Sequence, residues 1–131
     1  MQGPAAGVAA AGEGRDVSET SGEAPRPETL AAAQAAVDAS IQALGGYWPP
    51  LANLARLFEE CGELARAVNQ AHGPKRVKSG ETRAAAQEEL GDVLYTLLVL
   101  ANSLGVDAEV ALAEALAKVA GRVEPGGTAE G

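Results

Sequence analysis

The sequence contains little of what most fold classes and cofactor sites require. Of its 131 residues, one is cysteine, one is histidine and 3% are aromatic. A single cysteine excludes an internal disulfide framework and a zinc site built on cysteines. The scarcity of aromatic and β-branched side chains argues against a sheet protein. Positive charge is also scarce, because the formal net charge is −8, so a nucleic-acid polymer is not an expected partner.

Long apolar runs are missing as well. No stretch reaches the roughly 18 apolar residues of a membrane span, and the N-terminus has no basic region followed by an apolar one. We therefore expect no membrane association and a cytoplasmic location. Residues 1–27 and 124–131 consist mainly of Gly, Ala, Glu, Ser and Pro, a composition typical of disordered tails. The predicted folded domain is residues 28–123.

Apolar residues at helical spacing predict four helices, over residues 28–44, 50–72, 81–104 and 107–122. Proline suits the first turn of the second helix, Gly105 suits the end of the third, and Asp107 suits the N-cap of the fourth. The predicted fold class is all-α, a four-helix bundle-like subunit. Cys61 falls on the apolar stripe of the second helix, so we expect it in the core.

The third predicted helix is apolar on nearly every side between residues 93 and 101 (VLYTLLVLA). A helix of that kind is normally buried all round. Four short helices in one subunit can hardly surround it. The sequence therefore predicts a homodimer, or a tetramer, that forms through its helices, as small domains often gain stability by association.

An acidic motif occurs twice, as EECGELARAV at residues 59–68 and as EELGDVLYTL at residues 88–97. In each copy two acids stand three residues apart, which places them on neighbouring turns of one helix face. If the two helices pack antiparallel, four carboxylates converge, which is unfavourable without a cation. Oxygen-only ligands suit Mg²⁺ or Mn²⁺. The predicted metal ligands are Glu60, Glu63, Glu89 and Asp92.

Each motif also contains a glycine, Gly62 or Gly91, although glycine in a helix interior costs about 1 kcal/mol relative to alanine. Without side chains, the glycines would let the two helix backbones approach closely beside the acids. Glu59 and Glu88 would orient the ligands or hold a second ion. The alternative is a solvated helix face, since one acidic pair at this spacing is common, but a doubled motif is more specific.

Cationic residues that could hold a polyphosphate occur in two places. The loop GPKRVKSG at residues 73–80 contains Lys75, Arg76 and Lys78, which would bind phosphate oxygens or merely solubilise the loop. Lys118 and Arg122 share one face of the last predicted helix. They are either phosphate ligands or surface charges favoured near a helix C-terminus.

Few residues are marked for recognition of a base or sugar. Trp48, in the turn before the second helix, either stacks on a nucleobase or packs at one end of the bundle. Gln34 and Asp38 on the first helix are the remaining candidates. His72 belongs to no Glu-x-x-His pair, which counts against a ferritin-like di-iron site.

The pattern EExxE followed by ExxD, on two helices of a small α-bundle, resembles the MazG-like branch of the all-α NTP pyrophosphatases. The resemblance covers roughly residues 28–122 and is densest in YWPPLANLARLFEECGELARAVN and EELGDVLYTLLVLANSLGVD. It implies a Mg²⁺-dependent enzyme that splits nucleoside triphosphates into monophosphate and pyrophosphate, in housecleaning of the nucleotide pool. It implies the same four metal ligands, with Glu59 and Glu88 as auxiliary acids. Glu59 or Glu63 would accept the proton of the attacking water.

The chain departs from that family near its C-terminus. The family often has Asn-x-Lys-Phe followed by a basic residue, whereas this segment reads LAKVAGR, with Leu116 and Val119 in place of Asn and Phe. The departure concerns substrate contacts from the last helix and leaves the acidic cluster intact. Two alternatives stay open at this point: an enzyme resembling phosphoribosyl-ATP pyrophosphatase, and a non-catalytic metal-binding helical dimer.

Overall fold

The structure is a computed structural model that describes residues 24–74 and 79–123. These residues form four helices and no strand: α1 (Leu30–Ala43), α2 (Pro50–His72), α3 (Ser79–Ser103) and α4 (Ala108–Val123). The all-α class is confirmed, and every helix begins and ends within two residues of its predicted position. Apart from residues 24–27, the tails predicted to be disordered lie outside the described residues.

Local capping explains where the helices begin and end. The hydroxyl of Thr29, the N-cap of α1, accepts a hydrogen bond from a backbone N–H of the first turn at 3.0 Å. The predicted N-cap of α4 is also observed, because Asp107 Oδ1 accepts from the backbone N–H of Glu109 at 2.9 Å and of Val110 at 3.2 Å. Gly105, in the turn before α4, has φ +66°, a conformation that glycine adopts without strain.

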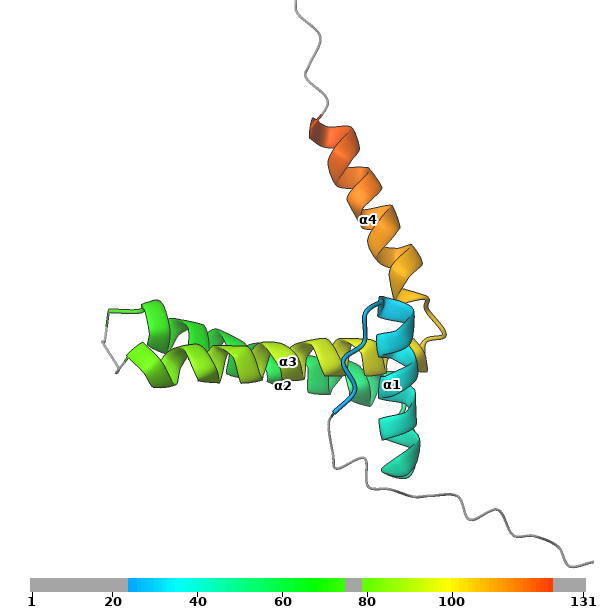
Figure 1. The fold of residues 1–131 in the computed structure, drawn as a ribbon, viewed down its shortest axis with the longest axis horizontal. Helices are drawn as coiled ribbons and strands as arrows, with labels where there is room; N and C mark the ends of the chain where they lie inside the picture. Colours follow the sequence, from blue (N-terminus) through cyan, green and yellow to red (C-terminus); the bar gives the residue numbers. More distant parts are fainter. Residues whose placement is uncertain (1–23, 75–78, 124–131) are drawn as a thin grey trace, which may run out of the picture.

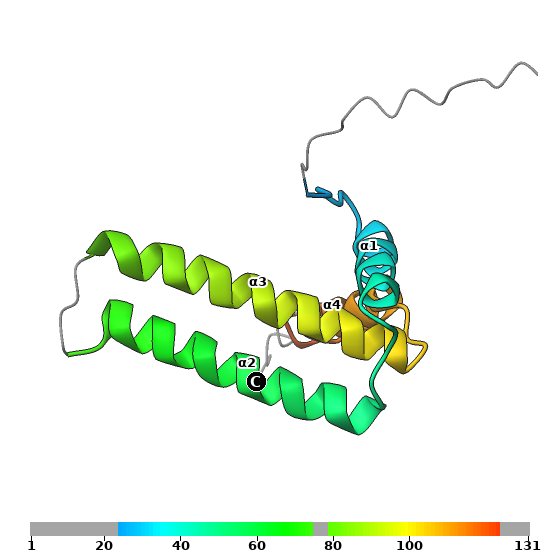
Figure 2. The same cartoon turned by 90° about the horizontal axis from the view of Figure 1, so that it is seen from below.

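The helices α2 and α3 pack side by side and antiparallel as a long hairpin (Figures 1 and 2). Helix α1 crosses α3 near one end of the hairpin. Helix α4 leaves the same end, at 107° to α3, and extends away from the hairpin. Its main tertiary contacts are with α1, and none of its residues is buried. The hairpin and α4 therefore form an L within one chain.

One side chain on α1 fixes the corner of this L. Gln34 Nε2 donates to Asn102 Oδ1 at 2.9 Å and to the carbonyl of Val106 at 2.8 Å. Gln34 Oε1 accepts from the backbone N–H of Ala108 at 2.9 Å, and Asn102 Nδ2 donates to the Gln34 carbonyl at 3.0 Å. These bonds join α1, the end of α3 and the start of α4, so the amide of Gln34 fixes how these three segments meet.

The core of the single chain is small. Among the described residues, the buried apolar side chains are Val37, Ala67 and Val99. As the sequence analysis expected of one subunit, the other helices do not surround α3, because Leu94 is 52% exposed and Leu97 is 46% exposed. Burial of this face by a partner subunit stays a prediction. A domain of this size normally needs more buried apolar surface than this to be stable.

Two further findings concern exposed surface. Cys61, expected in the core, is exposed, because the face of α2 that packs on α3 is rotated away from it. No single helix in the described part of the chain is both long and apolar enough to cross a membrane. Residues 84–103 of α3 and helix α4 meet the same test of length and composition only together, as a pair bent by 107°.

Candidate metal centre

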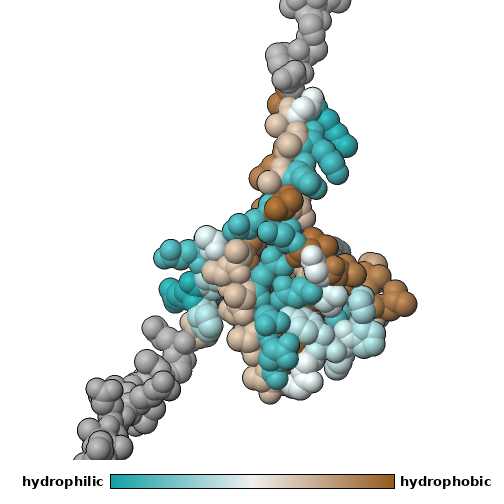
Figure 3. Space-filling view, turned by 90° about the vertical axis from the view of Figure 1, so that its right-hand side faces the viewer, coloured by the Kyte–Doolittle hydropathy of each residue, from teal (hydrophilic) through white to brown (hydrophobic). Residues whose placement is uncertain are grey.

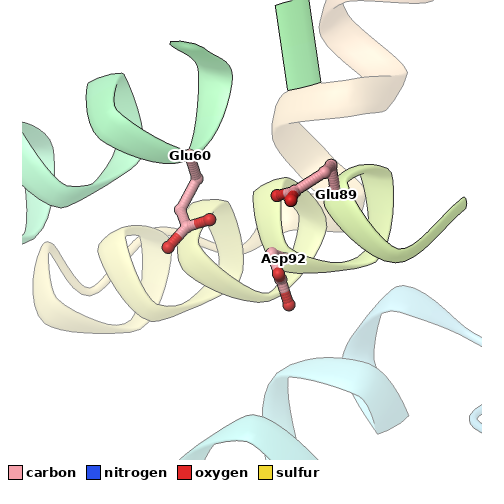
Figure 4. A group of neighbouring side chains, drawn as sticks. All are labelled: Glu60, Glu89 and Asp92. Atoms are coloured by element: carbon pink, nitrogen blue, oxygen red, sulfur yellow. The ribbon is translucent and has the colours of Figure 1, made fainter. Parts of the chain in front are cut away.

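Antiparallel packing of α2 and α3 brings the two acidic motifs together. One carboxylate oxygen from each of Glu60, Glu89 and Asp92 lies within 4.8 Å of the others. Glu60 comes from α2, whereas Glu89 and Asp92 come from neighbouring turns of α3, and Asp92 points toward α1 (Figure 4). Glu60 and Glu89 are half-buried, and Asp92 is exposed. Three of the four predicted metal ligands therefore converge.

Glu63, the fourth predicted ligand, stands at the edge of this acidic cluster. Its carboxylate does not belong to the close group of three. Its Oε2 instead lies 4.0 Å from Arg66 Nη1, and its side chain is more than half exposed. Because both are solvated, this pair contributes little to stability, and Glu63 is free to turn toward the cluster.

The neighbouring acids change the electrostatic environment of Glu89. Desolvation raises the pKa of the Glu89 carboxyl above its ordinary value, and the negative charges of Asp92, Glu63, Glu60 and Glu88 raise it further. Both effects disfavour the charged form of a carboxyl group. A divalent cation among the same oxygens would reverse the second effect, because its positive charge favours the charged form of each carboxyl group.

Sequence analysis did not identify Arg56, which lies one turn before Glu60. Arg56 Nη2 is 2.9 Å from Glu60 Oε1, and its Nη1 is 3.6 Å from Glu59 Oε2. The signal was present, because Arg56 and Glu60 are four residues apart on one helix, a spacing at which side chains meet. Arg56 supplies a positive charge beside the acidic cluster.

The two motif glycines do not have the role predicted for them. A Cβ atom added to Gly62 or Gly91 would meet nothing within 4 Å among the described residues. Close approach of α2 to α3 therefore does not require either glycine, and that prediction is wrong for a single chain. Both glycines face outward.

A cavity of about 450 Å³ adjoins the acidic cluster. Asp92, Glu60 and Arg56 line one part of it, and apolar and aromatic groups line the rest. Its lining residues are Ile41, Leu44, Gly46, Trp48, Asn53, Arg56, Glu60, Asp92, Tyr95, Thr96 and Val99. This combination of an apolar pocket with few polar groups is typical of a small-molecule site.

The turn that carries Trp48 is held from within the hairpin. Asn53 is buried, and its Nδ2 donates to the Trp48 carbonyl at 2.9 Å. This bond fixes the backbone of the turn at the mouth of the cavity, while the Trp48 side chain stays 61% exposed. An exposed indole at the edge of a pocket is available to stack on a planar ligand.

The remaining predicted site residues lie elsewhere. Lys75, Arg76 and Lys78 fall outside the residues whose structure is described. Lys118 and Arg122 are exposed on α4, which extends away from the hairpin (Figure 1). Gln34 is engaged in the corner of the L. Glu59 and Glu88, the first residues of the two motifs, are exposed.

Known proteins are similar to this chain in sequence and in fold. The sequence model of the MazG nucleotide pyrophosphohydrolase domain matches residues 49–125. The uncharacterized protein YpjD of Bacillus subtilis (strain 168) is 49% identical over 85 residues, which cover 64% of this chain and 77% of that protein.

Two solved structures resemble most of this chain. The crystal structure of the Bacillus-conserved MazG protein, a nucleotide pyrophosphohydrolase, superposes with a TM-score of 0.62 at 41% identity, over 72% of this chain and 93% of that one. The crystal structure of YPJD from Bacillus subtilis gives 0.64 at 44% identity, over 72% and 97%. Since the matched region contains both acidic motifs and α2 to α4, the chain belongs to the MazG nucleotide pyrophosphohydrolase family.

Proposed function

We propose that the protein is a Mg²⁺-dependent hydrolase that converts a nucleoside triphosphate, or a modified or deoxy nucleotide, into its monophosphate and pyrophosphate. Mn²⁺ would serve as an alternative ion. The observation that carries the proposal is the position of the acidic cluster, at one side of a cavity large enough for a nucleoside. Such an enzyme would act on the nucleotide pool, in the cytoplasm.

The residues present fit a hard divalent cation. Glu60, Glu89 and Asp92 offer only carboxylate oxygens, the donors that Mg²⁺ and Mn²⁺ prefer, and they do so within 4.8 Å of one another. Zn²⁺ is a poorer fit because the cluster contains no histidine or cysteine ligand. When bound, the ion would polarise the phosphoanhydride and make a coordinated water more acidic.

The residues around the cluster would share the other tasks. Glu59, Glu63 and Glu88 are carboxylates at its edge, and one of them would accept the proton of the attacking water. Arg56, which now pairs with Glu60, would turn to the phosphates, whose oxygens suit a guanidinium. Trp48 would stack on the base at the mouth of the cavity.

The predicted cations outside this group complete the proposal. Lys75, Arg76 and Lys78 lie in the sequence between α2 and α3 and would hold the outgoing phosphates. Lys118 and Arg122 would contribute from α4, which in a single chain points away from the cluster. Gln34 is set aside as a substrate contact, because its amide is occupied by Asn102, Val106 and Ala108.

The test is pyrophosphate release over a panel of nucleotides at saturating Mg²⁺. A triphosphate that yields equal amounts of monophosphate and pyrophosphate supports the proposal. Release from phosphoribosyl-ATP alone would identify the related enzyme instead. No release from any compound, while Mg²⁺ still raises the melting temperature, would leave a non-catalytic metal-binding protein.

A further inference from the structure

The cavity beside the acidic cluster contains the buried polar side chains of the described residues. Asn53 is 4% exposed and Thr96 is 6% exposed, and both line this cavity. The hydrophobic surface at the base of α4 differs (Figure 3), because the groove where α3 meets α4 is lined by apolar residues alone. A buried polar group costs free energy unless it has a hydrogen-bond partner, so the partners of these two side chains indicate what the cavity can bind.

The side-chain amide of Asn53 is only partly engaged within the chain. Its Nδ2 donates to the Trp48 carbonyl at 2.9 Å, and because a carbonyl oxygen only accepts, this contact fixes which end of the amide is the nitrogen. No described residue donates to Asn53 Oδ1. Every fully buried side-chain oxygen or nitrogen of the described residues has a partner, so Oδ1 is not sealed off and is accessible from the cavity. Thr96 differs, because its hydroxyl donates its one hydrogen to the Asp92 carbonyl at 2.8 Å.

Asn53 stands at the right distance from the acidic cluster to meet a nucleobase. Asn53, Arg56 and Glu60 all line the cavity, at spacings of three and four residues that keep them on one face of α2. Seven residues correspond to about 10.5 Å along a helix. A nucleotide whose phosphates lie at Glu60 and Arg56 would therefore reach Asn53 with its base, and its sugar would lie between.

We propose that Asn53 Oδ1 recognises the base of the substrate by accepting a hydrogen bond from an exocyclic amino group, so that nucleotides of cytosine and adenine are preferred. This inference rests on the proposed function, because it concerns the substrate of that reaction. The acceptor is nearly buried and its amide is already fixed by the Trp48 carbonyl, so Asn53 is a specificity-determining residue.

Bases without the amino group would be disfavoured. Uracil and hypoxanthine have nearly the size of cytosine and adenine but carry a carbonyl oxygen where those bases carry the amino group. That oxygen would face Oδ1, and both acceptors would lose water without gaining a hydrogen bond. The ring N–H of uracil or hypoxanthine stands next to the same carbonyl oxygen, so bringing it to Oδ1 also brings the two oxygens together.

The wild-type chain supplies the first test, as kcat/KM for pyrophosphate release from two matched pairs, dCTP with dUTP and dATP with dITP. A site built around a hydrogen bond to a substrate N–H discriminates strongly against an analogue that lacks it, so we expect at least a ~10-fold preference for the amino member of each pair. Release at equal kcat/KM within both pairs, or a preference for dUTP and dITP, would overturn the inference and leave the proposed function standing. No release from any nucleotide would overturn the proposed function and this inference with it.

Two full-length variants separate recognition of the base from the support that Asn53 gives to Trp48. Asn53→Asp and Asn53→Leu both remove the Nδ2 donor to the Trp48 carbonyl, but only Asn53→Leu removes the acceptor. The loss of that bond affects both members of a pair alike, so both variants should have a lower kcat/KM for every nucleotide. The ratio within each pair should stay at least ~10 in Asn53→Asp and fall to about 1 in Asn53→Leu. An unchanged ratio in Asn53→Leu, or a ratio lost in Asn53→Asp, would show that Oδ1 does not recognise the base.

Discussion

Replacing Asp92 with asparagine separates the chemistry of the acidic cluster from its role in folding. The amide has nearly the size of the carboxylate and removes one of three clustered charges. Asp92 is exposed and makes no side-chain hydrogen bond among the described residues; only its backbone carbonyl is engaged, by the Thr96 hydroxyl at 2.8 Å. Packing should therefore survive the substitution.

The expected loss of activity is large. Asp92→Asn leaves two charged ligands of three, so both the position of the ion and the stabilisation of charge in the transition state suffer. Removal of a single electrostatic contact to a transition state commonly lowers kcat by about 10²–10³. At about 1.36 kcal/mol for each factor of ten, this corresponds to roughly 2.7–4 kcal/mol of transition-state stabilisation.

The stability of the folded Asp92→Asn variant should not fall together with its activity. Without metal, one repulsive charge is gone from beside Glu89, so the melting temperature in EDTA should hold or rise. With millimolar Mg²⁺, the wild type should gain stability by binding the ion only in its folded state, and Asp92→Asn should gain less.

The assay is pyrophosphate release at saturating Mg²⁺, together with melting curves in EDTA and in Mg²⁺. Glu114→Gln is the matched control, because it neutralises an exposed acid on α4 outside both motifs. It should leave turnover nearly unchanged. Equal turnover of wild type and Asp92→Asn would refute the catalytic assignment of the cluster, whatever happens to the fold.

Two further outcomes are expected at the same site. Arg56→Met should raise KM for the nucleotide at least tenfold, and a KM like that of wild type would contradict the proposed contact between Arg56 and phosphate. The same substitution should tighten binding of Mg²⁺ alone, as measured by calorimetry, because Glu60 loses the arginine that competes with the ion. In EDTA, the stability attributable to Glu89 should fall as pH rises from its ordinary pKa through its raised pKa, because the unfolded chain loses its proton first. The melting temperature of the wild type minus that of Glu89→Gln should fall across this window, because only the wild-type side chain gains an unfavourable charge, and a constant difference would refute the reasoning.

Much of the fold followed from local signals in the sequence. The N-caps, the proline in the first turn of α2 and Gly105 act within a few residues, so helix boundaries could be predicted to within two residues. The convergence of three acids needed one more assumption, that α2 and α3 pair antiparallel across a short connection. Short connections between helices usually give such neighbours.

The position of α4 could not be predicted in the same way. It depends on contacts between residues far apart in the sequence, of which the hydrogen bonds from Gln34 to Asn102 and Val106 are the clearest. No periodicity marks a glutamine for that role, and an isolated polar residue on a helix is usually solvated. The expectation that Gln34 contacts substrate therefore rested on its position alone.

The sequence also did not predict which face of each helix is buried within one chain. Apolar spacing identified a stripe on α2 and a helix apolar all round at α3, but it did not say which apolar residues the chain itself covers. Cys61 and Leu94 are exposed although their spacing is helical and apolar. Burial inside one subunit and burial between subunits give the same pattern in a sequence.

The glycines of the two motifs test this distinction. Gly91 stands seven residues, about two turns, before Leu98, which lines an apolar groove between α3 and α4, so Gly91 and Leu98 share the outward face of α3. An added Cβ meets nothing within the chain, and alanine is the better helix former by about 1 kcal/mol. In a single chain, Gly91→Ala should therefore be stabilising.

In the homodimer that the sequence predicts, the effect of Gly91→Ala on stability should have the opposite sign. If the second copy packs over this face of α3, the added methyl group of Gly91→Ala meets the partner and weakens the dimer. Gly121→Ala is the matched control, because it makes the same change on α4 with nothing within 4 Å. Both variants should raise the melting temperature at submicromolar protein, whereas only Gly91→Ala should lose that gain at 50 µM. If Gly91→Ala raises the melting temperature equally at both concentrations, no partner covers Gly91. The glycine would then have no structural reason in the single chain or in the dimer.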